Sequence, residues 1–185
     1  MMATRGPRAR GTTYRQQINR APSPWRVHSV PYLSIMLASA LPVLLIADVM
    51  PLAPPLGFIM LLAWRLVRPG LLPLWAGLPL GAFDDLLSGQ PFGSAILLWS
   101  LAMIAIELIE ARFPWRDFWH DWFTAAVLLV AYWLACLLLS GAPATRAMLE
   151  VAWPQALLSV LLYPILARMV ARLDRFRLAR ARRID

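Results

Sequence analysis

The chain has 185 residues, of which 60% are hydrophobic and 15% are charged, and its net charge is +8 at pH 7. Soluble domains are typically about 45–50% apolar and about 25% charged, and so short a chain cannot hide this much apolar surface in its own interior. Composition therefore excludes an ordinary soluble domain and predicts a helical membrane protein. A basic balance can indicate nucleic-acid binding. Here the arginines sit at the ends of apolar runs, so we expect no nucleic-acid partner.

Six apolar runs follow one another along the chain, and we expect each of them to form a membrane-spanning helix. They cover approximately residues 30–49, 55–67, 71–87, 92–109, 123–139 and 148–170. The second run is short for a span, which takes about 20 residues. Its prolines stand near the expected start of the helix, where a missing N–H costs nothing. The predicted fold class is an all-α, polytopic membrane helical bundle with about six transmembrane helices.

The chain divides into three parts by composition. Residues 1–28 are polar and Arg-rich, and we expect a disordered basic arm there, because such a composition buries too little apolar surface to fold. Residues 29–172 form the predicted six-span membrane domain. Residues 173–185 form a basic tail that we expect to lie on an anionic leaflet. A signal peptide is the alternative for the start of the chain, with a cleavage site at 38–40, but the apolar run continues to Ile46 and favours an uncleaved helix.

Arginine placement predicts the topology. If the N-terminus lies in the cytoplasm, all but one of the 18 basic residues fall on the cytoplasmic side, and Arg146 is the exception. Membrane proteins keep an excess of basic residues in their cytoplasmic loops. We therefore predict that both termini are cytoplasmic. The outer loops are then short, and they leave no external domain for chemistry.

The third run carries two adjacent carboxylates, Asp84 and Asp85, before a tight turn over residues 88–91. If its helix begins near Leu71, the pair lies about 21 Å along it, toward the outer side of a hydrocarbon layer of about 30 Å. A carboxylate at this depth is costly. A negative charge near a helix C-terminus also opposes the helix dipole, so we expect another group to compensate for it.

Two hypotheses account for the carboxylates. In the first, Asp85 is a structural clasp that binds the free N–H groups at the start of the next helix, at residues 92–94. Asp84 then points about 100° away around the helix, toward another partner or water. In the second, the pair lines a cavity for a proton, a cation or a small ligand. We favour the clasp and leave the cavity open.

The predicted spans also contain two closely spaced glycines and a few single charged residues. Gly77 and Gly81 form a small-xxx-small face that lets another helix backbone come close, and Pro79 between them predicts a kink. Glu107 and Arg65 are both expected near the cytoplasmic ends, where they either pair or lie unpaired at the interface. The sequence holds no nucleophile, metal or phosphate motif. We therefore expect no enzyme and no catalytic, cofactor or metal site.

The stretch Asp85-Leu-Leu-Ser-Gly89-Gln-Pro91-Phe-Gly93 resembles the D-L-L-x-G-x-P-x-G signature of the bacterial rod shape-determining protein MreD family. Residues 94–99 fit the same alignment, and the resemblance covers roughly residues 30–172. The extra Asp84 and the long basic arm depart from the family pattern. Structural or partner-interface residues expected from these patterns are Asp84, Asp85, Gly89, Pro91, Gly93, Gly77 and Gly81.

The resemblance implies a non-enzymatic scaffold or adaptor in the cell inner membrane, within the complex that elongates rod-shaped cells. It implies as partners MreC, the MreB filament, and the cell-wall glycosyltransferase and transpeptidase, beside membrane lipid. It also implies a bundle similar to the substrate-binding subunits of vitamin-type transporters. A transporter-type subunit that binds a small ligand among its helices is thus the alternative. Polar residues in the spans are few and scattered, which favours the scaffold.

Overall fold

The computed structural model describes residues 24–46, 54–89, 91–113, 117–139 and 146–178. Within these ranges the regular secondary structure is all helical and includes no strand, which confirms the all-α part of the predicted fold class. Six α-helices and one 3₁₀ turn follow in the order α1 (Pro24–Ile46), α2 (Leu56–Val67), η1 (Leu74–Ala76), α3 (Gly77–Ser88), α4 (Ser94–Arg112), α5 (Phe118–Leu139) and α6 (Arg146–Leu178).

Three segments are long and apolar enough to cross a membrane. They are α4, α5 and the part of α6 over Ala152–Leu178. Two shorter apolar helices accompany them, His28–Leu44 within α1 and Leu56–Val67, which is α2. The six helices therefore match the number of predicted runs, while six complete spans and cytoplasmic termini stay predictions.

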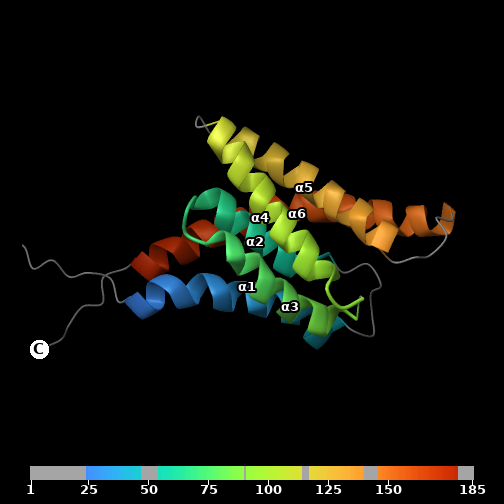
Figure 1. The fold of residues 1–185 in the computed structure, drawn as a ribbon, viewed down its shortest axis with the longest axis horizontal. Helices are drawn as coiled ribbons and strands as arrows, with labels where there is room; N and C mark the ends of the chain where they lie inside the picture. Colours follow the sequence, from blue (N-terminus) through green and yellow to red (C-terminus); the bar gives the residue numbers. More distant parts are fainter. Residues whose placement is uncertain (1–23, 47–53, 90, 114–116, 140–145, 179–185) are drawn as a thin grey trace, which may run out of the picture.

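Helix α2 forms the centre of the bundle. Every residue from Gly57 to Leu66 is buried, and the helix packs against α1, α4, α5 and α6. Figure 1 shows α2 behind α4 and among the other helices. A helix that is apolar on all sides is stable only when it is surrounded. Its short length fits this position, because a helix enclosed by protein need not match the thickness of the membrane.

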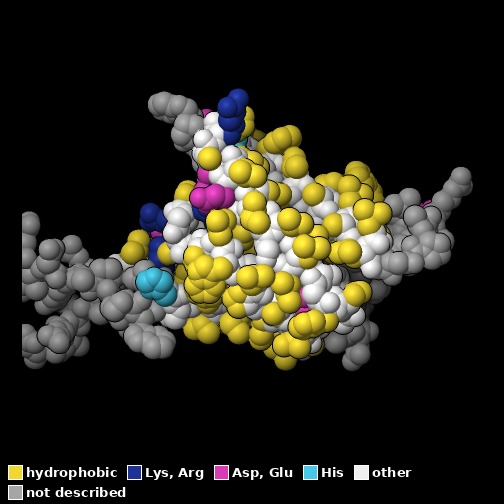
Figure 2. Space-filling view, in the orientation of Figure 1, with side chains coloured by type: hydrophobic (Ala, Val, Ile, Leu, Met, Phe, Trp, Pro, Cys, Tyr) yellow, Lys and Arg dark blue, Asp and Glu magenta, His cyan; other side chains and the backbone are white. Residues whose placement is uncertain are grey.

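The outer surface of the bundle is apolar as well. Large side chains on α1, α4, α5 and α6 are more than half exposed, and examples are Leu37, Leu108, Phe123 and Leu161. Figure 2 shows hydrophobic side chains over most of the visible face. Water-soluble monomers rarely expose so much contiguous apolar surface. The arrangement is that of a protein with lipid around it.

The third run is not one continuous helix. Residues 68–73 are non-helical, η1 follows, and α3 begins only at Gly77. Pro69 and Pro73 account for this, because a proline disfavours the α conformation of the residue before it. The expected helix from Leu71, and with it the distance of about 21 Å along one helix to Asp85, is therefore wrong, whereas the depth of Asp85 in the membrane stays a prediction. Pro79 lies in the first turn of α3, where its missing N–H breaks no helical hydrogen bond, so the expected kink has no cause.

The outer helices extend beyond the expected limits of the membrane domain. Helix α1 begins at Pro24, and α6 continues through residue 173 to Leu178. The N-terminal arm before residue 24 and the end of the tail after residue 178 lie outside the described residues. Ser39, in the alternative cleavage site, is buried in the bundle against α2. The first helix is thus part of the packed fold.

Candidate functional site

The Asp85 carboxylate lies at the start of α4 and is 5% exposed. It accepts backbone hydrogen bonds from Gly93 at 2.9 Å, Ala95 at 2.8 Å and Ile96 at 3.2 Å. The Ser94 hydroxyl donates a fourth hydrogen bond to it at 3.2 Å. The first N–H groups of a helix have no partner within the helix. One side chain from the end of α3 therefore serves several free donors of α4, in the arrangement of the clasp hypothesis.

Electrostatics favour the same contact. The N-terminus of a helix carries a partial positive charge, and the C-terminus carries a partial negative charge. Asp85 is near the unfavourable end of its own helix, but the positive end of α4 faces its carboxylate. Hydrogen bonds to a charged acceptor are roughly twice as strong as neutral ones. The clasp thus compensates for a buried charge and joins two helices at once.

The other residues of the motif shape the turn. Gly89 ends α3 with φ 66°, and Gly93 precedes α4 with φ 101°. Both values lie in the left-handed region, which glycine adopts without the steric cost that a Cβ atom imposes. The Pro91 carbonyl accepts a hydrogen bond from Ser94 N at 3.1 Å. The two glycines and the proline thus bring the start of α4 to Asp85.

Gly77 and Gly81 bring the α3 and α4 backbones into close contact. A Cβ atom on Gly81 would lie 2.8 Å from the Ala95 carbonyl oxygen, and one on Gly77 would lie 3.0 Å from Ser100 N. Backbone atoms cannot move aside as a flexible side chain can. Helices α3 and α4 are accordingly the most closely packed pair of the bundle. The two glycines and Asp85 act on the same helix pair.

Asp84 points away from the clasp, toward α1 and α2. A Cβ atom on Gly57 of α2 would lie 3.2 Å from Asp84 Oδ1 and 1.9 Å from the Oγ atom of Ser39 on α1. Both polar side chains therefore lie against Gly57, and the Ser39 hydroxyl occupies the space that a larger residue there would fill. Ser39 Oγ is buried, and the nearby Asp84 carboxylate is its hydrogen-bonding neighbour. The structure thus separates the two carboxylates that are adjacent in the sequence.

A second polar cluster joins α2 to the far end of α4. The Arg65 side chain is 2% exposed and contacts Glu107 and Glu110. Its Nη2 atom lies 2.8 Å from Glu110 Oε2, and its Nη1 atom donates to Glu110 Oε1 at 3.3 Å. Of the two alternatives for Arg65 and Glu107, the paired one is confirmed. Glu110 is a second partner that the sequence analysis did not name.

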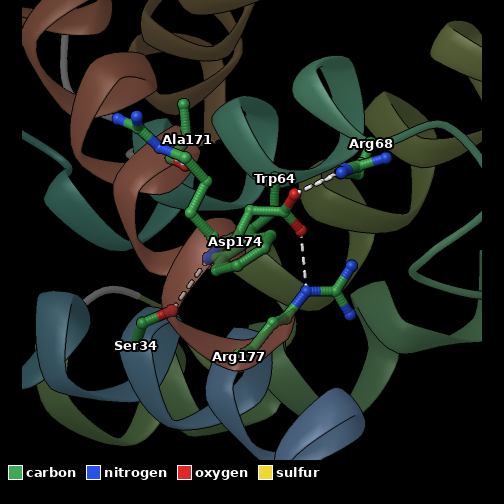
Figure 3. A network of polar contacts seen from close by, with 7 residues as sticks. Ser34, Trp64, Arg68, Ala171, Asp174 and Arg177 are labelled. Carbon is green, nitrogen blue, oxygen red and sulfur yellow. Dashed lines mark hydrogen bonds and ion pairs between the residues drawn. The ribbon is translucent and has the colours of Figure 1, made fainter. Parts of the chain in front are cut away.

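A third cluster joins the end of α6 to α2 (Figure 3). Asp174 is 4% exposed and binds Arg68 at 2.6 Å and Arg177 at 2.7 Å. The Arg177 guanidinium lies over the Trp64 ring, 5.7 Å from its centre, a favourable cation–π position. Sequence reasoning missed this cluster. The sequence gives one indication of this cluster, because Asp174 is the only acidic residue between residues 168 and 183.

The same cluster reaches α1 through the other edge of Trp64. The indole N–H donates to Ser34 Oγ at 2.8 Å, and the Ser34 hydroxyl donates to the Pro31 carbonyl at 2.8 Å. Figure 3 shows Ser34, Trp64 and Asp174 converging from three helices. Polar side chains thus fasten α1, α2 and α6 together at one end. In the described part of the chain, no three His, Cys, Asp or Glu side chains are grouped as metal ligands.

The family model described as rod shape-determining protein MreD matches residues 25–176 of the chain. This range contains all six helices except the first residue of α1 and the last two of α6. No curated protein and no solved structure matches the chain.

Proposed function

Because the chain belongs to the MreD family of rod shape-determining membrane proteins, we propose that it is a non-enzymatic scaffold of the cell-elongation complex. In this role it links MreC, the MreB filament and the cell-wall glycosyltransferase and transpeptidase. We place it in the cell inner membrane as a multi-pass protein with both termini in the cytoplasm. The distribution of arginine supports this orientation.

The main support for a scaffold role is that the buried charged side chains bind other groups of the same bundle. Asp85 binds the start of α4, and Arg65 binds its end. Asp174 binds Arg68, just after α2, and Arg177 of α6. A buried charge that is hydrogen-bonded within the fold stabilises one arrangement of helices. These groups serve internal contacts, as a bundle of fixed shape requires. A scaffold needs such a shape, because its partners recognise a surface that must not change.

We assign the predicted site residues a structural role within this scaffold. Asp85, Gly89, Pro91 and Gly93 set the α3–α4 turn, and Gly77 with Gly81 sets the distance between the two helices, as the contacts above support. Asp84 ties α3 to the α1–α2 side. Partners then bind outward faces that these residues orient, rather than the residues themselves.

A complementation experiment tests the proposal. In a rod-shaped bacterium depleted of its own family member, the wild-type chain should restore rod shape and recover MreC on purification. Asp85→Ala should lose both, and an exposed lipid-facing change such as Leu161→Ala should lose neither. Unchanged cell shape after depletion, with no MreC recovered, would contradict the scaffold role.

One observation favours the alternative of a transporter-type subunit. Asp84 and Ser39 come from different helices and meet beside Gly57 of a third, as a polar pair inside the bundle. Polar groups that converge from several helices are what a ligand site requires. If Asp84→Asn abolished uptake of a small molecule while Asp85→Ala only lowered protein stability, the transporter reading would replace the scaffold.

A further inference from the structure

The outward face of α4 carries apolar side chains at a regular spacing. The positions are separated alternately by four and three residues, and they are Leu97, Leu101, Ile104, Leu108 and Ala111. The four large side chains are 48–66% exposed. Spacing that averages 3.5 residues is the pattern of a helix that packs along one partner helix. On α6 the exposed residues Trp153, Leu157, Leu161 and Ile165 recur every four positions instead. On α5, Phe123, Val127, Val130 and Leu134 share the spacing of the α4 face, but no charged residue flanks them.

This face is not covered by the rest of the described chain. In Figure 1, α4 crosses the front of the molecule, and Figure 2 shows an apolar surface on the same side with acidic side chains toward the α5 end of the helix. Trp99, Met103 and Ile106 occupy the opposite side of α4 and are fully buried. The helix thus has an inner face that belongs to the bundle and an outer seam that no other described segment covers.

Two charges flank the seam at one end. In heptad notation Leu101 and Leu108 take position a, so Glu107 takes position g and Arg112 takes position e. When two helices pack in parallel, position g of one faces position e of the other, five residues later. Glu107 and Arg112 are five residues apart and opposite in charge. The helix therefore carries both halves of an ion pair that it can make with a copy of itself.

We propose that α4 is a homodimer interface, where two copies of this chain pack their seams in parallel and form two reciprocal Glu107–Arg112 ion pairs. Two copies inserted in the same membrane orientation are parallel by necessity. The contact of Glu107 with Arg65 uses Oε2 and leaves its side chain 53% exposed. Arg112 is exposed. Ala111 is small and lets the two backbones approach beside the charges.

The charges are what select a second copy over lipid. Apolar side chains gain little from leaving a lipid environment, so membrane helices associate through close packing and polar contacts. Lipid tails cover Leu97 or Leu101 as well as another helix does. They provide no charged partners for Glu107 and Arg112 at the end of the seam, whereas a second copy of α4 provides both. The inference goes beyond the proposed function, because a scaffold can act as a single copy.

Cysteine cross-linking in isolated membranes tests the interface. The single Cys136 is replaced by Ser, and one cysteine is introduced at Leu101, Ile104 or Leu108, or at the exposed control position Val127 on α5. Oxidation should give disulfide-linked dimers at the three seam positions and several-fold less at Val127. Equal yields at all positions, or no dimer at any of them, would overturn the proposal. So would a cross-linked product whose mass shows a different protein.

Charge exchange between two tagged chains tests the ion pairs. Arg112→Glu alone gives acidic groups at both sites, and Glu107→Arg alone gives basic groups at both, so each homodimer is repelled. The mixed dimer has two opposite-charge pairs. Each variant alone should form at least about two-fold fewer dimers than wild type, the scale of exposed ion pairs, and co-expression should restore mixed dimers. Failure of this recovery overturns the pairing.

The Glu107→Arg substitution does not remove every contact between α4 and Arg65. Arg65 has a second partner in Glu110, whose Oε2 lies 2.8 Å from Arg65 Nη2, so that variant keeps one acidic partner for the inner contact of α4. In the mixed dimer, each chain still carries its own substitution. If Glu107→Arg reduced dimers only by damaging the fold of its own chain, co-expression with Arg112→Glu would not restore them. Both experiments measure dimer formation and not cell shape. Failure of the dimer proposal can therefore be distinguished from failure of the scaffold role.

Discussion

Removal of the Asp85 carboxylate should weaken the α3–α4 hairpin more than any other single carboxylate change in these helices. Asp85→Ala takes away the acceptor of three backbone N–H groups and one hydroxyl. These donors are at a helix start that is packed against α3, and water cannot replace the carboxylate where Ser94 and Ala95 are buried. The substitution therefore leaves donors without partners as well as removing a contact.

The size of the effect follows from the distances. Two of the backbone hydrogen bonds are short, at 2.8 and 2.9 Å, and two contacts are longer, at 3.2 Å. A hydrogen bond to a charged group contributes about 1.5–3 kcal/mol, and the charge–dipole attraction at the start of α4 adds about 0.5–1 kcal/mol. If only the two short bonds count, each at the lower value, Asp85→Ala lowers the free energy of unfolding by about 3.5–4 kcal/mol.

Unfolding of the purified protein in detergent, followed by tryptophan fluorescence, measures this loss. Asp84→Ala is the matched control, because it removes a neighbouring carboxylate that has no backbone donors of α4. We expect the control to lose less than half as much. Asp85→Asn should fall between them, since its amide keeps one acceptor oxygen but places an N–H₂ group against N–H donors. An Asp85→Ala variant as stable as its control would refute the clasp.

Three further changes test the contacts that fix α4, α2 and α6. Gly81→Ala puts a Cβ atom 2.8 Å from the α4 backbone and should cost about 1–3 kcal/mol in the same assay; an unchanged midpoint would contradict the close approach. Arg65→Leu leaves Glu107 and Glu110 without their cation and should cost about 3–5 kcal/mol, part of which Glu110→Gln should restore; purely additive losses would show that the groups do not interact. Asp174→Asn should speed tryptic cleavage within residues 168–178, and an unchanged rate would argue against the α6 cluster.

The α3–α4 clasp could be anticipated because its parts are close in the sequence. Asp85 and Gly93 are eight residues apart, and the glycines and proline between them leave the chain few ways to turn. A carboxylate before such a turn meets the free N–H groups of the next helix almost by necessity. The limits of α2 could be anticipated for a similar reason, since its apolar run is bounded by prolines and arginines.

The α6 cluster could not be anticipated in this way. Asp174 and Arg68 are 106 residues apart, and nothing local distinguishes Arg68 from the exposed arginines of the tail. Their pairing depends on how α6 crosses α2, which the apolar pattern of α6 leaves open because it is apolar on several sides. The basic composition of residues 173–185 therefore predicts a leaflet-bound tail, whereas the structure packs Arg177 against Trp64.

Helix α4 is fixed to the bundle at both ends by groups of opposite kind. At its start, Asp85 holds the N–H groups that no side chain of α4 itself caps, and near its end, Arg65 holds two carboxylates. Between these points Gly77 and Gly81 hold the backbone close to α3. A helix fastened at two ends cannot rotate about its axis without breaking one of the contacts. The outward direction of the Leu97–Ala111 seam is therefore set by the family motif and by Arg65, although none of these residues lies on the seam.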